Sequence, residues 1–252
     1  MSSSISKLPR WLVAVLLIFL LAVAGFYLWA ASPPQPMPEA LRALNPIQEV
    51  SITETESGWW VYESTLIAAN QGLILYPGNR IDPRAYAPLA RDLAANGYLV
   101  VVPRMPFNFA FFNKDVAADI QAAYPEISGW ALGGHYQGGA VAAEYAANHP
   151  NDVTALILWA ATPPEDVSLT TANYPITIIY GSADGLVPPA KVEASRNQFP
   201  ATAEFIEIAG GNHAQFVWSS PPANDNEATI TRQDQTGQVI AATVQTLRRS
   251  AP

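Results

Sequence analysis

Residues 129–150 read GWALGGHYQGGAVAAEYAANHP, and this stretch decides the fold class. A short apolar run at 129–132 predicts a buried strand, and the alanine-rich segment at 137–148, stopped by Pro150, predicts a helix. Four glycines lie in the turn between them, at 133–139. Such a turn lets backbone segments approach closely. A strand followed directly by a helix is the repeating unit of α/β proteins.

The same alternation continues on both sides of this stretch. Two initial strands, joined by a Ser57-Gly58 turn, are expected at 48–55 and 59–62. Apolar runs predict further strands at 72–76, 98–102, 155–160, 176–180 and 204–208. Helical spacing predicts helices at 83–96, 115–123, near 190–198 and at 231–248. The sequence therefore predicts an α/β domain over 39–252, with a mostly parallel central sheet flanked by helices.

The N-terminal region has a different composition. Residues 11–31, WLVAVLLIFLLAVAGFYLWAA, carry no charge. As a helix they would be about 31 Å long, close to the roughly 30 Å hydrocarbon thickness of a bilayer. Aromatic residues lie at both ends, as is typical of membrane interfaces. The segment is predicted to be a transmembrane signal anchor.

Two bases and no acid flank this segment on its N-terminal side. Lys7 and Arg10 predict that residues 1–10 are cytoplasmic and that the domain is extracytoplasmic. The alternative is a cleaved signal peptide, with its apolar region at 12–21 and its cleavage site at Ala22-Val23-Ala24, which would release a secreted domain. Residues 32–38 contain four prolines and predict an extended spacer that holds the domain clear of the membrane.

Composition argues against several classes of partner, metal site and cofactor. After the first 32 residues the chain has 11 bases against 21 acids, a net charge of −10, which argues against a nucleic-acid partner. The absence of cysteine excludes thiolate nucleophiles and thiolate zinc sites, and no paired-histidine spacing indicates a metal. The Gln137-Gly138-Gly139 turn lacks the Lys-Ser/Thr ending of a phosphate loop, so no cofactor is expected.

Four polar or glycine-rich loops follow predicted strands, at the edge of a parallel sheet where function usually resides. They are Pro77-Gly78-Asn79 and the segments GGHYQGG at 133–139, GSADG at 181–185 and AGGNH at 209–213.

Together with YPGNRIDPRAYAPLARDLAANGYLVVVPRMP at 76–106, YGSADGLVPP at 180–189 and GGNHAQF at 210–216, these loops resemble the α/β-hydrolase fold over about residues 48–248. The chain is most similar to bacterial fold-5 type domains, relatives of lipases, esterases and dienelactone hydrolases. The resemblance implies a catalytic triad in the chain order nucleophile, acid and base, at position 136, Asp184 and His213. It also implies that the backbone N–H groups of Asn79 and Gln137 form the oxyanion hole.

The nucleophile position departs from the family pattern. The family motif G-x-S-x-G reads Gly134-His135-Tyr136-Gln137-Gly138 here. A phenol oxygen lies several ångströms further from the backbone than a serine oxygen, and its acyl product would be an aryl ester. An aromatic residue in this strained turn also costs about 1–3 kcal/mol. Neither Ser128, before the strand, nor Ser182, on the acid loop, lies on this turn.

Two functions follow as hypotheses. The first is a membrane-anchored hydrolase of the esterase or lipase type acting on a small apolar or ester substrate, with Tyr136 either an atypical nucleophile or a disabling substitution. The second is a catalytically silent protein that binds an apolar ligand or a protein partner, with Tyr136 as a pocket wall.

Three further features have expected roles outside the triad. His135 is expected to be a packed or hydrogen-bonded residue of the turn, and His149 a solvated residue at a helix end. The segment PFNFAFF at 106–112 is expected to be either loop packing or a pocket wall.

Overall fold

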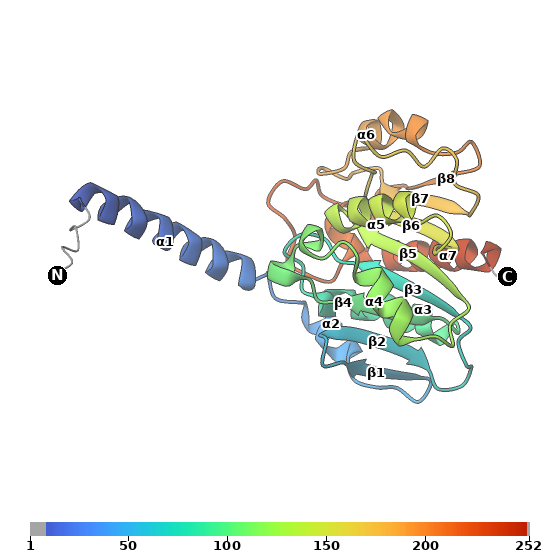
Figure 1. Ribbon diagram of the computed structural model, residues 1–252. Helices are drawn as coiled ribbons and strands as arrows, with labels where there is room; N and C mark the ends of the chain where they lie inside the picture. Colours follow the sequence, from blue (N-terminus) through green and yellow to red (C-terminus); the bar gives the residue numbers. More distant parts are fainter. Residues whose placement is uncertain (1–8, 251–252) are drawn as a thin grey trace.

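An eight-stranded sheet runs through the centre of the protein in the computed structural model, which describes residues 9–250 (Figure 1). Its strand order is β1-β2-β4-β3-β5-β6-β7-β8. The strands are β1 (Val50–Glu54), β2 (Trp59–Ser64), β3 (Gln71–Tyr76), β4 (Leu99–Pro103), β5 (Gly129–His135), β6 (Ala155–Trp159), β7 (Ile176–Gly181) and β8 (Glu204–Ile208). The β1–β2 and β2–β4 pairs are antiparallel, and all other pairs are parallel. The predicted α/β fold with a mostly parallel sheet is confirmed.

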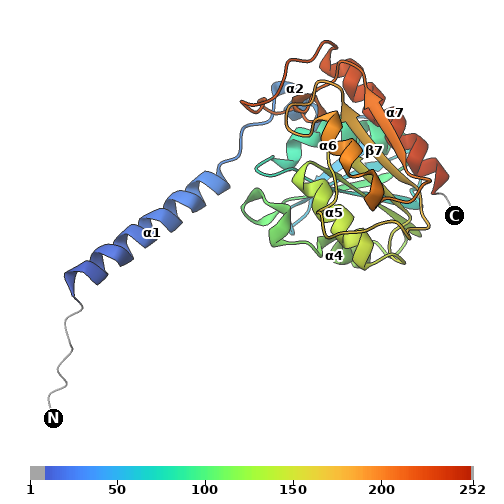
Figure 2. The ribbon, with the colours of Figure 1, turned by 90° about the horizontal axis from the view of Figure 1, so that it is seen from above.

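Helices cover both faces of the sheet. One face carries α2 (Pro38–Ala43), α3 (Ala87–Ala95) and α7 (Arg232–Arg249), and the other carries α4 (Val116–Ala123), α5 (Gln137–Asn148) and α6 (Pro189–Ala194). Figure 2 shows α4 and α5 on one side of the sheet and α7 on the other. Each face has its own hydrophobic core, because the inner strands are buried on both sides.

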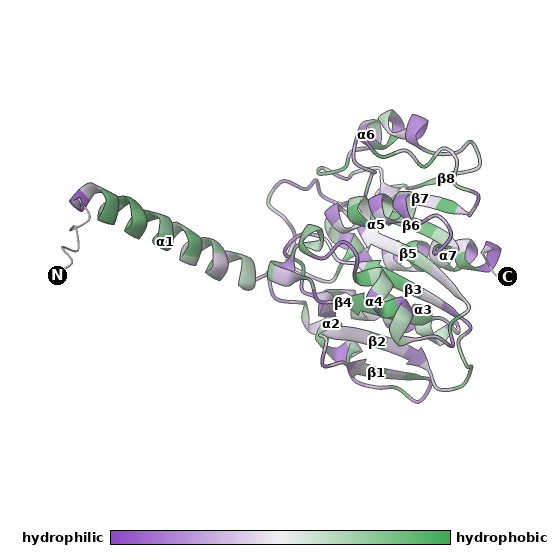
Figure 3. Cartoon of the chain, in the orientation of Figure 1, coloured by the Kyte–Doolittle hydropathy of each residue, from purple (hydrophilic) through white to green (hydrophobic). Residues whose placement is uncertain are grey.

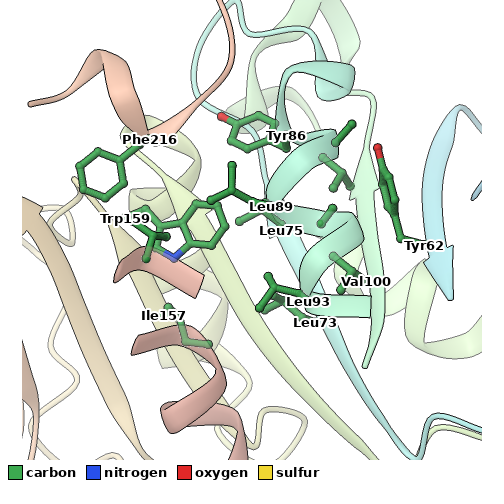
Figure 4. Packing of buried hydrophobic residues seen from close by; sticks show 14 of the residues in the cluster. Tyr62, Leu73, Leu75, Tyr86, Leu89, Leu93, Val100, Ile157, Trp159 and Phe216 are labelled. Atoms are coloured by element: carbon green, nitrogen blue, oxygen red, sulfur yellow. The ribbon is translucent and has the colours of Figure 1, made fainter. Parts of the chain in front are cut away.

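The core under α3 and α7 is built from aromatic and branched side chains (Figure 4). Leu73 and Leu75 of β3 and Leu93 of α3 are completely buried there. Burying one such side chain contributes about 1.5–3 kcal/mol. Trp159 of β6 is also completely buried, and its indole N–H donates to the Thr243 hydroxyl of α7 at 3.2 Å. This bond ties the last helix to the centre of the sheet.

The boundaries differ from the sequence prediction in a few places. β5 continues to His135, three residues beyond the predicted end, because its glycines keep the extended conformation up to the turn. The helix predicted at 83–96 begins with a 3-10 turn at Pro83–Tyr86, where the Asp82 side chain accepts from the Arg84 N–H. The short helix α2 was not predicted, since six residues that follow a proline-rich segment show no clear periodicity.

Helix α1 (Arg10–Ala31) extends away from the domain, and nearly all of its side chains are exposed. Figure 3 shows that it is apolar along almost its whole length. It is the one helix within residues 9–250 that is long and apolar enough to cross a membrane, a property that a signal sequence shares. The predicted cytoplasmic segment 1–10 lies, except for its last two residues, outside the described residues.

The proline segment after α1 lies against the domain. The Met37 N–H donates to the Trp218 carbonyl at 2.8 Å, and Pro36 forms an isolated bridge with Ser219. Arg80 donates to the Ser32 carbonyl at 3.0 Å. Residues 32–38 are therefore bonded to the domain surface, which the sequence did not indicate. The backbone N–H and carbonyl groups of an extended segment have no partners within the segment, and here the domain provides them.

Candidate active site

The turn between β5 and α5 places Tyr136 at the carboxyl edge of the sheet. Its backbone has φ 52° and ψ −120°, a strained conformation for a residue with a side chain. The turn is tight enough that a Cβ on Gly134 would lie 2.5 Å from the Gly139 Cα, and a Cβ on Gly138 would lie 2.2 Å from the Pro77 carbonyl oxygen. Glycine is therefore required on both sides of Tyr136, as the sequence pattern predicted.

Asp184 and His213 meet at the same edge, from the loops that follow β7 and β8. The His213 Nδ1 lies 2.9 Å from the Asp184 Oδ2, and both side chains are almost completely buried. The other carboxylate oxygen of Asp184 accepts from the Leu186 and Val187 N–H groups at 2.8 and 2.7 Å. These bonds fix the carboxylate, which in turn orients the imidazole. This is the arrangement that a general base requires.

Two residues that the sequence analysis did not identify hold these loops in place. The half-buried Asp225 carboxylate accepts from the N–H groups of Gly185, His213 and Ala214 at 2.9, 3.3 and 2.7 Å. It thereby joins the loop of the acid to the loop of the base. Gln235, buried in α7, exchanges two hydrogen bonds with the backbone of Asn212. No motif signals either role, because both residues act on backbone groups distant in sequence.

The predicted oxyanion donors lie on two adjacent loops. Asn79 follows β3, and Gln137 is the first residue of α5. Neither backbone N–H is used in a hydrogen bond between residues of the described part of the chain. Free backbone N–H groups of this kind are the donors that an oxyanion hole uses, and the oxyanion role of Asn79 and Gln137 stays a prediction.

A buried tyrosine holds the loop of Asn79 against the turn of Tyr136. The Tyr86 hydroxyl accepts from the Gly78 N–H at 2.9 Å and lies 3.0 Å from the His135 Nδ1. The hydroxyl therefore joins the loop of Asn79 to the His135 imidazole. Burial lowers the pKa of His135 well below 6.5, and the nearby His213 lowers it further. His135 therefore stays neutral, as a hydrogen-bonded residue of the turn.

The Tyr136 side chain contacts the base without a hydrogen bond. Its ring meets the His213 ring edge to face, with centroids 5.0 Å apart. No hydrogen bond joins the two side chains in the described structure. Tyr136 also lines a cavity of about 400 Å³ between the start of α5 and α6, where Glu165 and Lys191 are the charged lining residues. The phenol is thus part of a pocket wall next to the base.

The other serines and histidines considered from the sequence have structural contacts of their own. Ser182 accepts from the Gly210 N–H at 2.8 Å, and Ser128 donates to the Asn70 carbonyl at 3.0 Å at the opposite edge of the sheet. Neither replaces the missing serine. His149 stacks on Tyr145 at the end of α5. Within residues 9–250, no group of three His, Asp or Glu side chains is placed to hold a metal ion.

The aromatic segment 106–112 follows β4 and does not line the cavity beside Tyr136. Its side chains contact the last turns of α1, where Phe109 lies 6.0 Å from Trp29 between ring centroids. The segment therefore packs against α1, and its residues Pro106, Phe107 and Asn108 line a different cavity, of about 610 Å³, at the end of that helix. Its partner is the N-terminal helix, which lies far away in the sequence.

Comparison with known proteins agrees with this geometry. A sequence profile of the alpha/beta hydrolase family matches residues 72–237, and the chain belongs to this family. No curated protein matches the sequence significantly.

Solved structures show the same fold at low sequence identity. A CIB-like hydrolase of Thermoplasma acidophilum is 15% identical, with a TM-score of 0.59 and coverage of 79% of this chain and 99% of that one. Est1E from Butyrivibrio proteoclasticus, solved with ferulic acid bound, is 12% identical, with a TM-score of 0.59 and coverage of 81% and 98%. A structure from work on the metagenome-derived lipolytic enzymes LipS and LipT is 15% identical, with a TM-score of 0.57 and coverage of 85% and 99%. The chain therefore has an esterase- and lipase-like hydrolase fold.

Proposed function

We propose that this protein is a membrane-tethered hydrolase of the esterase or lipase type, with Asp184 and His213 as acid and base and Tyr136 at the nucleophile position. Its substrate class is a small apolar molecule, such as an acyl ester. The observation that carries the proposal is the buried 2.9 Å contact between Asp184 and His213, directly beside the turn of Tyr136. A buried pair of this kind contributes little net free energy to folding. Such pairs are typical of sites where the imidazole takes part in a reaction.

Each group has a defined part in ester cleavage. The N–H groups of Asn79 and Gln137 would bind the carbonyl oxygen and stabilise its negative charge as the tetrahedral intermediate forms. His213 would accept the proton of the attacking oxygen and return it to the leaving alcohol, while Asp184 holds the imidazole in one tautomer. The attacking oxygen belongs at position 136, where this chain has a phenol. The phenol must then form an aryl ester, a reactive acyl intermediate that accumulates poorly.

A second candidate is a hydrolase-fold protein that binds its ligand without cleaving it. Two observations favour it: the Tyr136 ring forms part of the wall of the 400 Å³ cavity, and its contact with His213 is edge to face without a hydrogen bond. An apolar wall beside a polar edge is typical of small-molecule pockets.

One assay separates the two candidates. The full chain in detergent is compared with Tyr136→Phe, Tyr136→Ser and His213→Ala for hydrolysis of p-nitrophenyl butyrate. Turnover by the parent that is lost in both Tyr136→Phe and His213→Ala shows that the phenol is the nucleophile. Turnover that arises only in Tyr136→Ser supports the binding function with an intact framework. Tyr136→Phe is a sharp control, because it removes only the hydroxyl.

A fluorophosphonate probe tests the assigned base independently of turnover. It should label Tyr136→Ser at position 136 and fail to label the Tyr136→Ser/His213→Ala double variant. If Tyr136→Ser stays unlabelled although folded, the assignment of Asp184 and His213 is wrong.

The membrane tether is tested separately. We expect the membrane fraction of cells that express the full chain to contain the intact N-terminal peptide, including residues 11–31. A soluble product whose sequence begins after Ala24 would instead establish a cleaved signal peptide and a secreted domain.

A further inference from the structure

Three exposed phenylalanines form a continuous surface on the turns that follow β4. Phe107, Phe111 and Phe112 are 40%, 48% and 46% exposed. The Phe111 and Phe112 ring centroids lie 4.3 Å apart, and those of Phe107 and Phe112 lie 5.3 Å apart. Isolated exposed apolar residues are common, but a stacked group of large aromatic residues usually marks an interaction site.

This aromatic surface is joined directly to the last turns of α1. Phe107 meets Tyr27 edge to face at 6.0 Å between ring centroids, and the Asn108 side chain donates to the Ala30 carbonyl at 2.8 Å. Phe107 and Asn108 both have positive φ angles, 54° and 60°. Such a backbone persists only when its surroundings hold it, and the contacts with α1 are part of these surroundings. Aromatic side chains at the end of α1 therefore contact the aromatic surface of the domain directly.

The same junction reaches the loop of the predicted oxyanion hole. The Arg80 N–H, one residue after Asn79, donates to the Asn108 carbonyl at 2.7 Å. The Arg80 guanidinium lies 4.0 Å above the Trp29 ring. Figures 1 and 2 show α1 leaving the domain from this side and extending outward. A bilayer that contained α1 would consequently lie across the carboxyl edge of the sheet.

From this geometry we propose that Phe107, Phe111 and Phe112 are a second membrane contact, which inserts into the bilayer interface and holds the active-site edge against the lipid. The proposal rests on the proposed function in two ways: α1 spans the membrane, and the edge of the sheet beside it carries the hydrolase site. Trp and Tyr favour the depth of the lipid headgroups, and Tyr27 and Trp29 would lie at that depth on a spanning helix. The aromatic surface lies beside them. Phenylalanine is among the apolar residues that interfacial segments bury at the boundary of headgroups and acyl chains. Arginine next to such residues keeps its charge in the headgroup region while its stem covers apolar surface.

The arrangement has a consequence for substrate access. An enzyme whose oxyanion loop lies beside the interface can take its ligand from the bilayer. The inferred substrate class is then an acyl ester that partitions into the membrane. An ester that dissolves freely in water gains nothing from such a position.

The test uses the full chain, which has no cysteine of its own, with single cysteines carrying an environment-sensitive fluorophore. The test positions are Phe111→Cys and Phe112→Cys. The matched controls are Leu66→Cys and Ile67→Cys, because Leu66 and Ile67 are also exposed, at 68% and 55%, and lie on the β2–β3 loop at the opposite edge of the sheet. Leu20→Cys, in the middle of α1, reports whether α1 spans.

Each protein is reconstituted into phosphatidylcholine vesicles whose acyl chains carry bromine either near the headgroup or near the bilayer centre. We expect several-fold quenching of the labels at 111 and 112 by bromine near the headgroup, of the label at 20 by central bromine, and of neither control. Quenching at 20 without quenching at 111 and 112 overturns the second contact and leaves the anchor intact. No quenching at 20 overturns the anchor itself. If the labels at 111 and 112 are shielded from aqueous iodide but not quenched by lipid bromine, a protein covers the surface and the proposal is wrong.

Discussion

The two halves of the candidate site differ in how completely they are built. On the side of the base, Asp184, His213 and Asp225 are joined by hydrogen bonds that leave the imidazole fixed between two loops. On the side of the nucleophile, the turn keeps its backbone geometry, but Tyr136 meets the base only through the edge of an aromatic ring. The first half has the acid and base groups that the proposed reaction needs, and the second has the backbone turn without the serine.

This difference indicates that the backbone framework of the site is specified independently of the residue at position 136. The strained turn is specified by Gly134 and Gly138, which approach other backbone atoms closely whatever residue lies between them. The pairing of acid and base is specified by loops after β7 and β8, which contain no residue of the turn. Position 136 can therefore change without loss of the rest of the site. Substitutions in the half that contains the base, made in the Tyr136→Ser chain, should therefore show whether its groups act in catalysis.

The largest effect is expected from the acid. In the Tyr136→Ser chain, Asp184→Asn should lower kcat for p-nitrophenyl butyrate on the order of 10³-fold, since the amide no longer stabilises the imidazolium or its tautomer. Steady-state kinetics in detergent measures the change. The melting temperature should change little, because the amide oxygen still accepts from the Leu186 and Val187 N–H groups. An unchanged kcat would remove Asp184 from the site.

A smaller effect is expected from the residue that joins the two loops. Asp225→Ala removes the acceptor of the Gly185, His213 and Ala214 N–H groups and should lower kcat of the Tyr136→Ser chain roughly 10–100-fold through displacement of His213. Asp225 is a positioning residue, so Asp225→Asn, which retains one acceptor oxygen, should recover part of the rate. The exposed Asp166, changed to alanine, is the control. Equal rates for Asp225→Ala and Asp166→Ala would show that the junction is not needed.

The stability of the loop that carries Asn79 should depend on the Tyr86 hydroxyl. Tyr86→Phe leaves the Gly78 N–H and the His135 Nδ1 without their partner and should lower the free energy of unfolding by roughly 1–3 kcal/mol. Urea unfolding of the full chain, followed by tryptophan fluorescence, measures it. Tyr62→Phe is the matched control, since the Tyr62 hydroxyl is buried without a partner in the described structure and its loss should cost nothing. Equal destabilisation by both changes would contradict the role given to Tyr86.

The smallest effect concerns pH. Because the pKa of His135 is lowered on folding, the unfolded chain binds a proton that the folded chain rejects once the pH falls below about 6.5. The free energy of unfolding should therefore decrease on acidification, by at most about 1.4 kcal/mol per pH unit from this group. The contribution is absent above the unfolded pKa. In His135→Asn, which does not titrate, the pH dependence of unfolding between pH 7 and 5 should be shallower. An unchanged slope would show that His135 does protonate in the fold.

Local sequence patterns predicted most of the fold. Parallel strands buried on both faces, such as β3 and β7, are continuous apolar runs, and glycine or proline marks their ends. The helix α2 and the docking of residues 32–38 were missed, because both depend on surfaces such as that of Trp218 that only the folded domain provides. The contact between α1 and the aromatic segment 106–112 joins parts of the chain that no periodicity connects.

The candidate site was predictable where it follows from motifs. The turn at 133–139, Asp184 and His213 lie on loops after strands, and the parallel topology brings such loops together. Tyr86, Asp225 and Gln235 were not predictable, because each acts by binding backbone groups of another loop, and an isolated tyrosine, aspartate or glutamine has many possible partners in a sequence. Their roles depend on contacts that form only once the chain is folded.

The central claim is that the site is a complete hydrolase framework except for the residue at position 136. The most direct measurement is kcat/KM for p-nitrophenyl butyrate of the Tyr136→Ser chain relative to the parent and to Tyr136→Ser/His213→Ala. We expect the serine to raise the value at least about 100-fold, and the loss of His213 to abolish that gain. A folded Tyr136→Ser chain no faster than its parent, or one equally fast without His213, would contradict the account.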